Sequence, residues 1–217
     1  MKKLTLTSAA IFDPQAAASV RRRGNRESRV PEIIDVSINV LIAAGYAGYT
    51  INRVANDAGI RLSTLQHYFS TREALLRATI EEIARRYFER FRAFVENKSR
   101  SPQARLEALI DDAFAEFVRP GMPAGILESW GLALHESFAR DVVVEVQKRF
   151  TALFGKLVGE INPALSMEER ELRGALIVSS CQGLVIFLRW SEDDASRMNA
   201  FRRAIKVVWT GLGKADE

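Results

Sequence analysis

Apolar residues recur along most of this chain at the spacing of amphipathic helices. Over residues 30–42 they occupy positions i, i+3, i+4 and i+7, and Gly45 is expected to end that helix. Similar stripes follow over residues 76–91 and 106–117. No stretch alternates polar and apolar residues between hairpin turns, as a strand would. The pattern therefore predicts an all-α protein of about nine helices.

Three predicted helices begin with residues that cap helices. Ser70 and Ser166 each stand three positions before a glutamate, and Ser101 is followed by proline. A serine hydroxyl accepts a hydrogen bond from a free amide of the first turn, where proline is also tolerated. We therefore expect helices to start at these three serines.

Residues 51–68 are the most informative segment, because two short helical stretches are separated there by Gly59. The small side chain of Ala55 lets two helices cross closely, and glycine adopts the left-handed turn conformation that a Cβ opposes. Val54 and Leu65 supply apolar contacts between the two stretches. This arrangement predicts a helix-turn-helix, which presents its second helix to the major groove of DNA.

The outer side of that second helix carries hydrogen-bonding side chains suited to base edges and phosphates. These residues are Arg61, Ser63, Thr64, Gln66 and His67. Thr50 is expected to cap the first helix, so that the free amides and the dipole of this helix face a phosphate. The cations Arg53 and Arg72 complete the candidate DNA contacts.

Basic residues are concentrated ahead of this segment. The chain has 31 Lys and Arg against 27 Asp and Glu, but residues 1–30 have 7 against 2, and residues 31–77 have 4 against 4. Residues 1–27 show no sustained helical period. We interpret them as a flexible basic arm, which is either an auxiliary contact to DNA or a solvated terminus.

Residues 29–76 resemble the DNA-binding domain of the TetR family of bacterial transcriptional regulators. The resemblance rests on the AAGY sequence that ends the first helix, Thr50, the run Val54-Ala55-x-x-Ala58-Gly59-Ile60, the pair Tyr68-Phe69, and Arg72 with Ala74-Leu75-Leu76. Together with the helical layout, it implies a helix-turn-helix domain over residues 28–76. It also implies an effector-binding and dimerisation domain over residues 77–217.

The resemblance implies roles for individual residues. Groove-facing positions are occupied by Arg61, Leu62, Ser63, Thr64 and His67. Positions that contact phosphates or neighbouring bases in the family are occupied by Thr50, Gln66, Tyr68 and Arg72. The family usually has Tyr, His and Lys at the last three of these positions. Leu62 offers only a contact to a thymine methyl group.

The resemblance further implies a homodimer that binds a palindromic operator and responds to an unidentified small-molecule effector. In the family the last two helices, here residues 167–190 and 194–212, form a four-helix bundle with the partner. The first of these is apolar nearly all round, so both core and partner are expected to cover it. The expected dimer contacts include Leu184, Phe187, Leu188, Phe201, Ile205, Val208 and Trp209. The chain is therefore interpreted as a ligand-responsive regulator, and specifically as a repressor that the effector releases from DNA.

Aromatic residues on the inner sides of the later helices are candidates for an effector cavity. The candidate lining residues are Phe91, Phe114, Phe117, Trp130, Leu134, Phe138, Phe150 and Phe154, with His135 as a polar group that would orient a ligand. The alternative is that most of them pack as ordinary core residues.

Other classes of protein lack support in the sequence. The single cysteine, Cys181, forms no internal disulfide, and one Cys with two His cannot supply a Cys/His zinc site. Because phosphate-binding and hydrolase motifs are missing, we expect no catalytic residues, no metal and no cofactor. No run of 18 apolar residues occurs, so we expect a cytoplasmic protein without a membrane segment. An all-helical enzyme or an adaptor without DNA binding remains the alternative.

Overall fold

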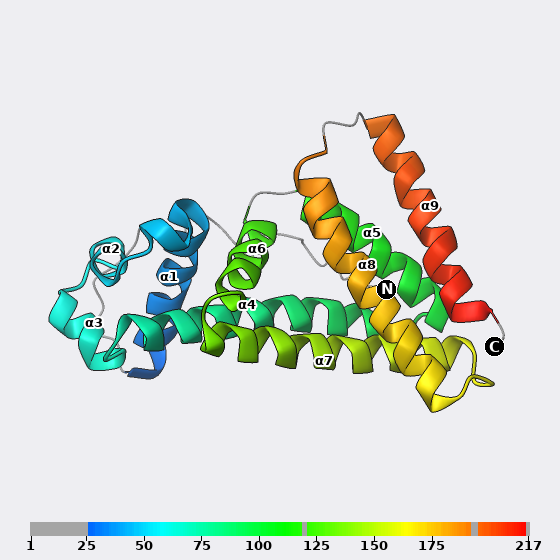
Figure 1. Cartoon of the computed structure of the whole chain (residues 1–217), viewed down its shortest axis with the longest axis horizontal. Coiled ribbons are helices and arrows are strands. Elements are labelled where there is room, and N and C mark those ends of the chain that lie inside the picture. The colour runs from blue at the N-terminus through cyan, green and yellow to red at the C-terminus, as the bar shows by residue number, and fades with distance from the viewer. Residues whose placement is uncertain (1–25, 119–120, 192–194, 216–217) are drawn as a thin grey trace, which may run out of the picture. The chain divides into compact units, whose positions relative to one another are not determined.

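The computed structural model describes residues 26–118, 121–191 and 195–215, which form nine α-helices and no strands (Figure 1). The helices are α1 (Arg26–Gly48), α2 (Ile51–Asp57), α3 (Leu62–Tyr68), α4 (Arg72–Val95), α5 (Pro102–Phe117), α6 (Met122–Ala133), α7 (Ser137–Ile161), α8 (Met167–Arg189) and α9 (Ala195–Lys214). The predicted all-α fold is therefore confirmed.

The chain divides into two compact units, Met1–Glu82 and Ile83–Glu217. The division falls inside α4, a few residues beyond the boundary at residue 76 that the sequence indicated. No linker marks it, because the helix continues through it. Of the predicted basic arm, residues 1–25 lie outside the described residues, whereas residues 26 and 27 already belong to α1.

Two glycines of the first unit have a positive φ, as predicted for Gly59, whereas Gly45 was predicted only to end the first helix, which in fact extends to Gly48. Gly45 has a φ of 62° and a ψ of 178°, which interrupts α1 shortly before its last turn. Gly59 has a φ of 62° in the turn between α2 and α3. A residue with a Cβ would be strained at either position.

The predicted caps are confirmed at three of four helices. Thr50 Oγ1 accepts from the amide of Arg53, Ser101 Oγ from that of Ala104, and Ser166 Oγ from that of Glu169. For α4 the prediction of Ser70 was wrong, because Thr71 Oγ1 accepts the hydrogen bond from the amide of Ala74 at 3.0 Å. Both residues carry a hydroxyl, so the local pattern did not distinguish them.

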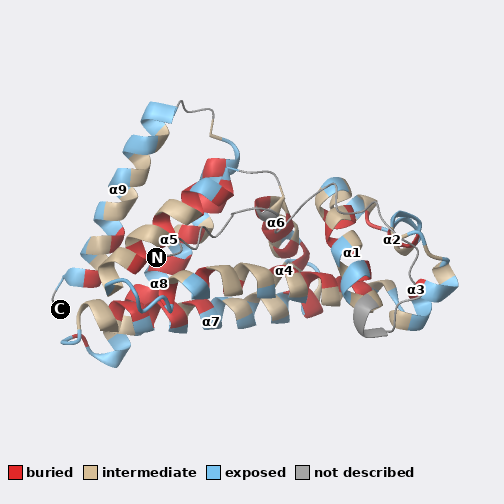
Figure 2. Cartoon of the chain, turned by 180° about the vertical axis from the view of Figure 1, so that it is seen from behind, coloured by how far each residue is buried: buried red, intermediate tan, exposed pale blue. Residues whose placement is uncertain are grey.

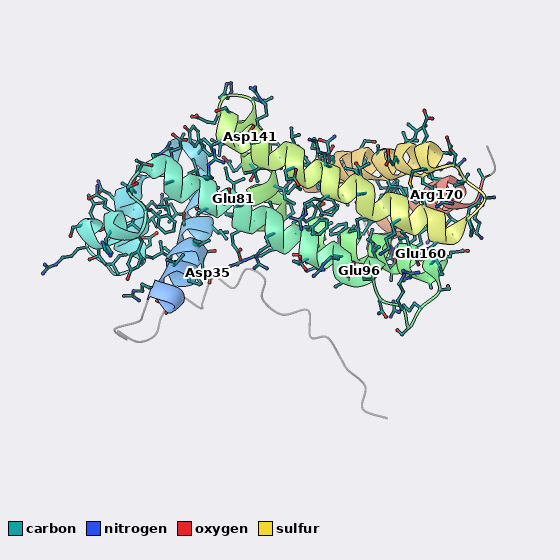
Figure 3. All side chains as sticks on the ribbon, turned by 90° about the horizontal axis from the view of Figure 1, so that it is seen from below. Asp35, Glu81, Glu96, Asp141, Glu160 and Arg170 are labelled. Carbon is teal, nitrogen blue, oxygen red and sulfur yellow. The ribbon has the colours of Figure 1, made fainter. Side chains whose placement is uncertain are left out.

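The second unit contains the rest of α4 and the helices α5 to α9. Its buried residues gather where α7 and α8 meet (Figure 2). In the same region Gly155 of α7 approaches the backbone of α8, and Arg170 of α8 lies against Gly159 of α7 (Figure 3). The indole of Trp209 is buried and donates to Ser180 Oγ at 3.0 Å, which ties α9 to α8.

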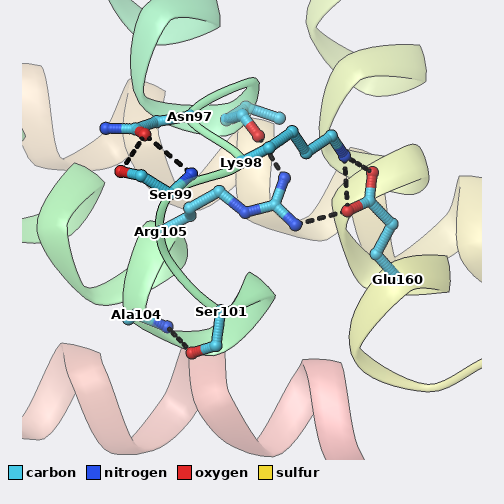
Figure 4. Close-up of polar contacts among 8 residues, drawn as sticks. Asn97, Lys98, Ser99, Ser101, Ala104, Arg105 and Glu160 are labelled. Atoms are coloured by element: carbon cyan, nitrogen blue, oxygen red, sulfur yellow. Dashed lines mark hydrogen bonds and ion pairs between the residues drawn. The ribbon is translucent and has the colours of Figure 1, made fainter.

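Ion pairs join the helices of the second unit at several places, among them Lys206 of α9 with Asp111 of α5 at 2.7 Å. The guanidinium of Arg90 on α4 binds both carboxylate oxygens of Asp112 on α5, at 2.7 and 2.6 Å. At the far end of α7, Glu160 accepts from Lys98 at 2.6 and 2.7 Å and from the buried Arg105 (Figure 4). These contacts fix the connection between α4 and α5 against α7.

Two helical segments, Arg29–Gly48 and Met167–Arg189, are long and apolar enough to cross a membrane by length and composition alone. Core helices of soluble proteins have the same properties, so this finding is weak evidence for a membrane segment.

Candidate nucleic-acid interface and effector site

Helix α3 has one buried position and a polar outer face. Leu65 is fully buried, together with Val54 of α2. Ser63, Thr64, Gln66 and His67 are all exposed. Because all four lie one or two residues from Leu65 in a helix of 3.6 residues per turn, their side chains point away from the side of the buried leucine. The outer face of α3 is therefore a surface of uncharged hydrogen-bonding groups and one imidazole.

The turn between α2 and α3 holds α3 in place. The amide of Gly59 donates to the carbonyl of Asn56 at 3.0 Å, and that of Ile60 donates to the carbonyl of Ala55 at 3.0 Å. These bonds satisfy carbonyls that the end of α2 leaves free. Ala55 is buried, in agreement with its predicted role at the helix crossing.

The remaining candidate DNA contacts differ in accessibility. Thr50, Arg53 and Arg61 are exposed, whereas Leu62 and Tyr68 are half-buried. Arg53 has only a distant ionic neighbour, Asp57, at 4.0 Å. Both members of that pair are about half exposed, so the pair contributes little to stability.

Arg72 is different, because its guanidinium is bound within its own unit. Its Nε donates to the carbonyl of Tyr49 at 3.2 Å, and its Nη2 donates to the carbonyl of Tyr46 at 3.3 Å. Its Nη1 donates to the phenol oxygen of Tyr46 at 3.2 Å. The guanidinium carbon also lies 4.5 Å from the centre of the Tyr46 ring. The sequence did not indicate these partners, which lie more than twenty residues away.

The aromatic candidates of the second unit fall into two groups. Phe91, Phe117 and Phe154 are buried and lie together, with the ring of Phe91 6.4 Å from that of Phe117 and 6.3 Å from that of Phe154. Phe150 joins them, 5.5 Å from Phe91. Phe114 instead packs against Phe201 of α9 at 5.8 Å. We call the group formed by Phe91, Phe117, Phe150, Phe154 and Tyr87 the aromatic cluster.

Other candidates lie outside the cluster. Leu134 is 74% exposed and His135 is also exposed, because α6 ends at Ala133 and both belong to the turn that follows. Trp130 is half-buried, and Phe138 is buried at the start of α7.

Tyr87 is a polar member of the cluster that sequence reasoning did not select. Its ring lies 4.8 Å from Phe91 and 5.1 Å from Phe150. Burial, and to a smaller extent the neighbouring Cys181, raises the pKa of its phenol well above 10.0. Its place on the inner stripe of α4 was visible in the sequence, but phenylalanines share that stripe, so a polar role was not apparent.

The described residues contain no group of three or more His, Cys, Asp or Glu side chains that could hold a metal ion. The half-buried Asp112 and the buried Glu116 of the second unit bind the guanidinium of Arg90 instead.

Comparison with known proteins places this geometry in one family. Residues 33–79 match the model of bacterial regulatory proteins of the tetR family. The chain is 28% identical over 157 residues to the HTH-type transcriptional regulator BetI of Burkholderia thailandensis, covering 71% of this chain and 80% of the relative. It is 25% identical over 166 residues to BetI of Vibrio campbellii, covering 74% and 80%.

Solved structures share the fold. A TetR transcription regulator from Haloarcula marismortui has a TM-score of 0.69 at 19% identity, covering 86% of this chain and 97% of that chain. The multidrug binding protein EbrR, solved with malachite green, has a TM-score of 0.64 at 18% identity, covering 85% and 97%. With the helix-turn-helix of α2 and α3, the match over residues 33–79 and the similarity to the BetI regulators show that this chain carries a DNA-binding domain of the TetR type, as a DNA-binding transcriptional regulator does.

Proposed function

We propose that this regulator reads its operator with the outer face of α3 and is a repressor that a small molecule releases from DNA. The observation that carries the proposal is the exposed set Ser63, Thr64, Gln66 and His67, held over the buried Leu65. Their hydrogen-bonding groups suit base edges, and no carboxylate among them repels phosphate. Arg53 and Arg61 are exposed cations for the DNA backbone.

A palindromic operator requires two copies of the chain. The structure leaves a largely apolar face of α8 and α9 uncovered, and we propose a second copy as its occupant. On α8 this face has Leu172, Leu176 and Phe187, followed by the C-cap residue Trp190, which is 68% exposed, and on α9 it has Val207 and Val208. An exposed apolar surface spread over two long helices is typical of an interface.

The expected dimer contacts divide into three sets, of which Phe201 and Ile205 form the half-buried one. Phe187 and Val208 belong to the uncovered face. Leu184, Leu188 and Trp209 are buried within the chain itself, so they support the face from behind. A helix that is apolar nearly all round does not reveal from its sequence which side its own subunit covers.

The effector is proposed to be an apolar or aromatic compound that binds at the aromatic cluster. Flat rings such as Phe91 and Phe150 favour such compounds, and the phenol of Tyr87 is a polar group that could orient one. EbrR, which shares the fold, was solved with malachite green. A ligand that prefers one conformation would shift the spacing of the two α3 helices away from the roughly 34 Å between half-sites.

We place the regulator in the cytoplasm, where the DNA lies.

DNA reading is tested by selecting duplexes from a random-sequence pool with the purified protein. Affinities for the selected duplex and a scrambled one are then measured at several salt concentrations. Gln66→Ala should lower the ratio of the affinities for the selected and the scrambled duplex by about tenfold, because one lost base contact is worth roughly 1–3 kcal/mol. The matched control is Gln147→Ala on the exposed side of α7, which should leave the preference unchanged. Recovery of no preferred sequence by the wild-type protein would refute operator reading.

The effector site is tested with malachite green as the probe. Bound dye should raise the melting temperature and lower the affinity for the selected duplex, because a ligand stabilises the state that it binds. Tyr87→Phe, which keeps the ring, should weaken dye binding if the phenol orients the ligand. Absence of dye binding to the wild-type protein would exclude this compound class at the cluster.

A further inference from the structure

Tyr49 is held at both ends by residues of α4 and α1. Its side chain is fully buried, and its phenol oxygen lies 2.6 Å from Ser37 Oγ. Ser37 Oγ lies 2.6 Å from Thr79 Oγ1, which donates to the carbonyl of Leu75 at 2.7 Å. At its other end, the Tyr49 carbonyl accepts a hydrogen bond from Arg72 Nε. The residue before the cap of α2 is therefore anchored through both its side chain and its backbone.

The guanidinium of Arg72 makes three hydrogen bonds to this segment, one from each nitrogen. Two reach main-chain carbonyls, of Tyr46 and Tyr49, and the third reaches the phenol of Tyr46. Its guanidinium carbon also lies 4.5 Å from the centre of the Tyr46 ring and 5.5 Å from the centre of the Tyr49 ring. A planar fork with several donors can make all of these contacts at once, whereas a lysine ammonium cannot.

The segment Tyr46–Tyr49, which the hydrogen bonds from Arg72 hold in place, determines where α2 begins. It starts after the left-handed Gly45 and ends before Thr50, whose hydroxyl caps α2. Helix α2 in turn packs on α3 through Val54 and Leu65. A shift of the Tyr46–Tyr49 segment would therefore move the helix pair that presents the outer face of α3.

We infer that Arg72 is a positioning residue for DNA recognition and not chiefly a phosphate ligand. It places the α1–α2 turn, and through that turn the reading helix, by binding the carbonyls of Tyr46 and Tyr49. This inference rests on the proposed role of α3 in reading DNA. It differs from the sequence-based expectation that the charge of Arg72 contacts a phosphate.

Salt dependence separates the two roles. Each phosphate contact adds about 0.9 to the slope of log affinity against log salt concentration. We expect Arg72→Gln and Arg72→Lys to weaken binding to the selected duplex by about tenfold each, with the wild-type slope retained. Arg53→Gln is the reference, because this exposed cation is the proposed phosphate contact and should lower the slope by about 0.9.

Two results would overturn the inference. The first is wild-type affinity in Arg72→Lys, since a lysine keeps the charge but loses the fork. The second is a fall of about 0.9 in the slope for Arg72→Gln. Circular dichroism shows whether Arg72→Gln folds. If it does not, the affinity of Arg72→Lys for the selected duplex tests the inference.

Amide hydrogen exchange of the free protein tests the clamp without DNA. Arg72→Lys should speed exchange in the Tyr46–Thr50 segment, whereas Arg53→Gln should not, because Arg53 makes no bond to that segment through its side chain. Equal exchange in Arg72→Lys and the wild type would also overturn the positioning role. If exchange changes but the wild-type protein selects no duplex, the clamp stands and DNA reading by α3 fails.

Discussion

Gly174 of α8 lies directly against Gly155 of α7, with no room for a side chain between the helices. A methyl group on Gly174 would stand 2.7 Å from the amide nitrogen of Gly155 and 2.6 Å from the carbonyl oxygen of Thr151. A methyl group on Gly155 would in turn stand 3.1 Å from the carbonyl oxygen of Arg170. The two backbones are therefore in contact, and neither can move aside as a flexible side chain could.

We predict that Gly174→Ala destabilises the protein by about 1–3 kcal/mol, because the methyl group would meet backbone atoms and force the helices apart. The measurement is the free energy of unfolding in urea. Gly131→Ala is the matched control, since a methyl group there meets nothing within 4 Å. In a helix that change should be neutral or stabilise by up to about 1 kcal/mol. Equal effects of the two variants would contradict the close crossing.

Because the carboxylate of Glu160 binds two cations, we predict that the stability of the folded protein depends on pH. Burial acts to raise its pKa, but the hydrogen bonds from Lys98 and Arg105 outweigh burial and hold the pKa below 4.5. A carboxylate with a lowered folded-state pKa stabilises the protein above its unfolded-state pKa and loses that effect as pH falls through the folded-state value. Glu160→Gln should therefore cost stability at neutral pH, and the difference from wild type should shrink below about pH 4.5.

The control for Glu160 is Lys98→Met. Lys98 is largely exposed, so its removal should cost less than about 1 kcal/mol. Arg105 is only 2% exposed, and loss of the carboxylate leaves this guanidinium without its ionic partner. A Glu160→Gln difference that stays constant from neutral to acidic pH would show that the carboxylate charge is not involved.

If a second copy covers the apolar face of α8 and α9, a charged residue placed in that face should prevent dimerisation. Val208→Asp should convert a dimer to a monomer in sedimentation velocity, because association would bury an unpaired carboxylate. Val144→Asp on α7 is the control, since Val144 is a half-exposed valine outside that face. A wild-type protein that sediments as a monomer at micromolar concentration, or a Val208→Asp protein that remains dimeric, would argue against this interface.

Cys181 should be chemically inert in the folded protein. It is buried in α8, and burial raises the pKa of its thiol far above its ordinary value, so the reactive thiolate is scarce at pH 8. A chromogenic disulfide reagent should react only after denaturant is added. Rapid reaction of the native protein would show that α8 opens at this position.

Local features of the sequence were sufficient for much of the fold. The apolar period located the helices, Gly59 marked a turn that needs a positive φ, and Ser101 and Ser166 marked helix starts. Each of these signals acts within one or two turns of the chain, so it can be read without knowing the rest of the molecule. Where two local choices were equivalent, as at Ser70 and Thr71, the sequence did not decide between them.

The sequence by itself determined the all-α class, the helix-turn-helix and the identity of the residues on the outer face of α3. Only the tertiary structure decided which apolar residues of α8 stay uncovered, why Leu134 and His135 lie in the open, and that Arg72 binds Tyr46 and Tyr49. Helical period records which residues share a face. It does not record which distant segment covers that face or which partner a long charged side chain reaches, because those depend on contacts between residues far apart in the chain.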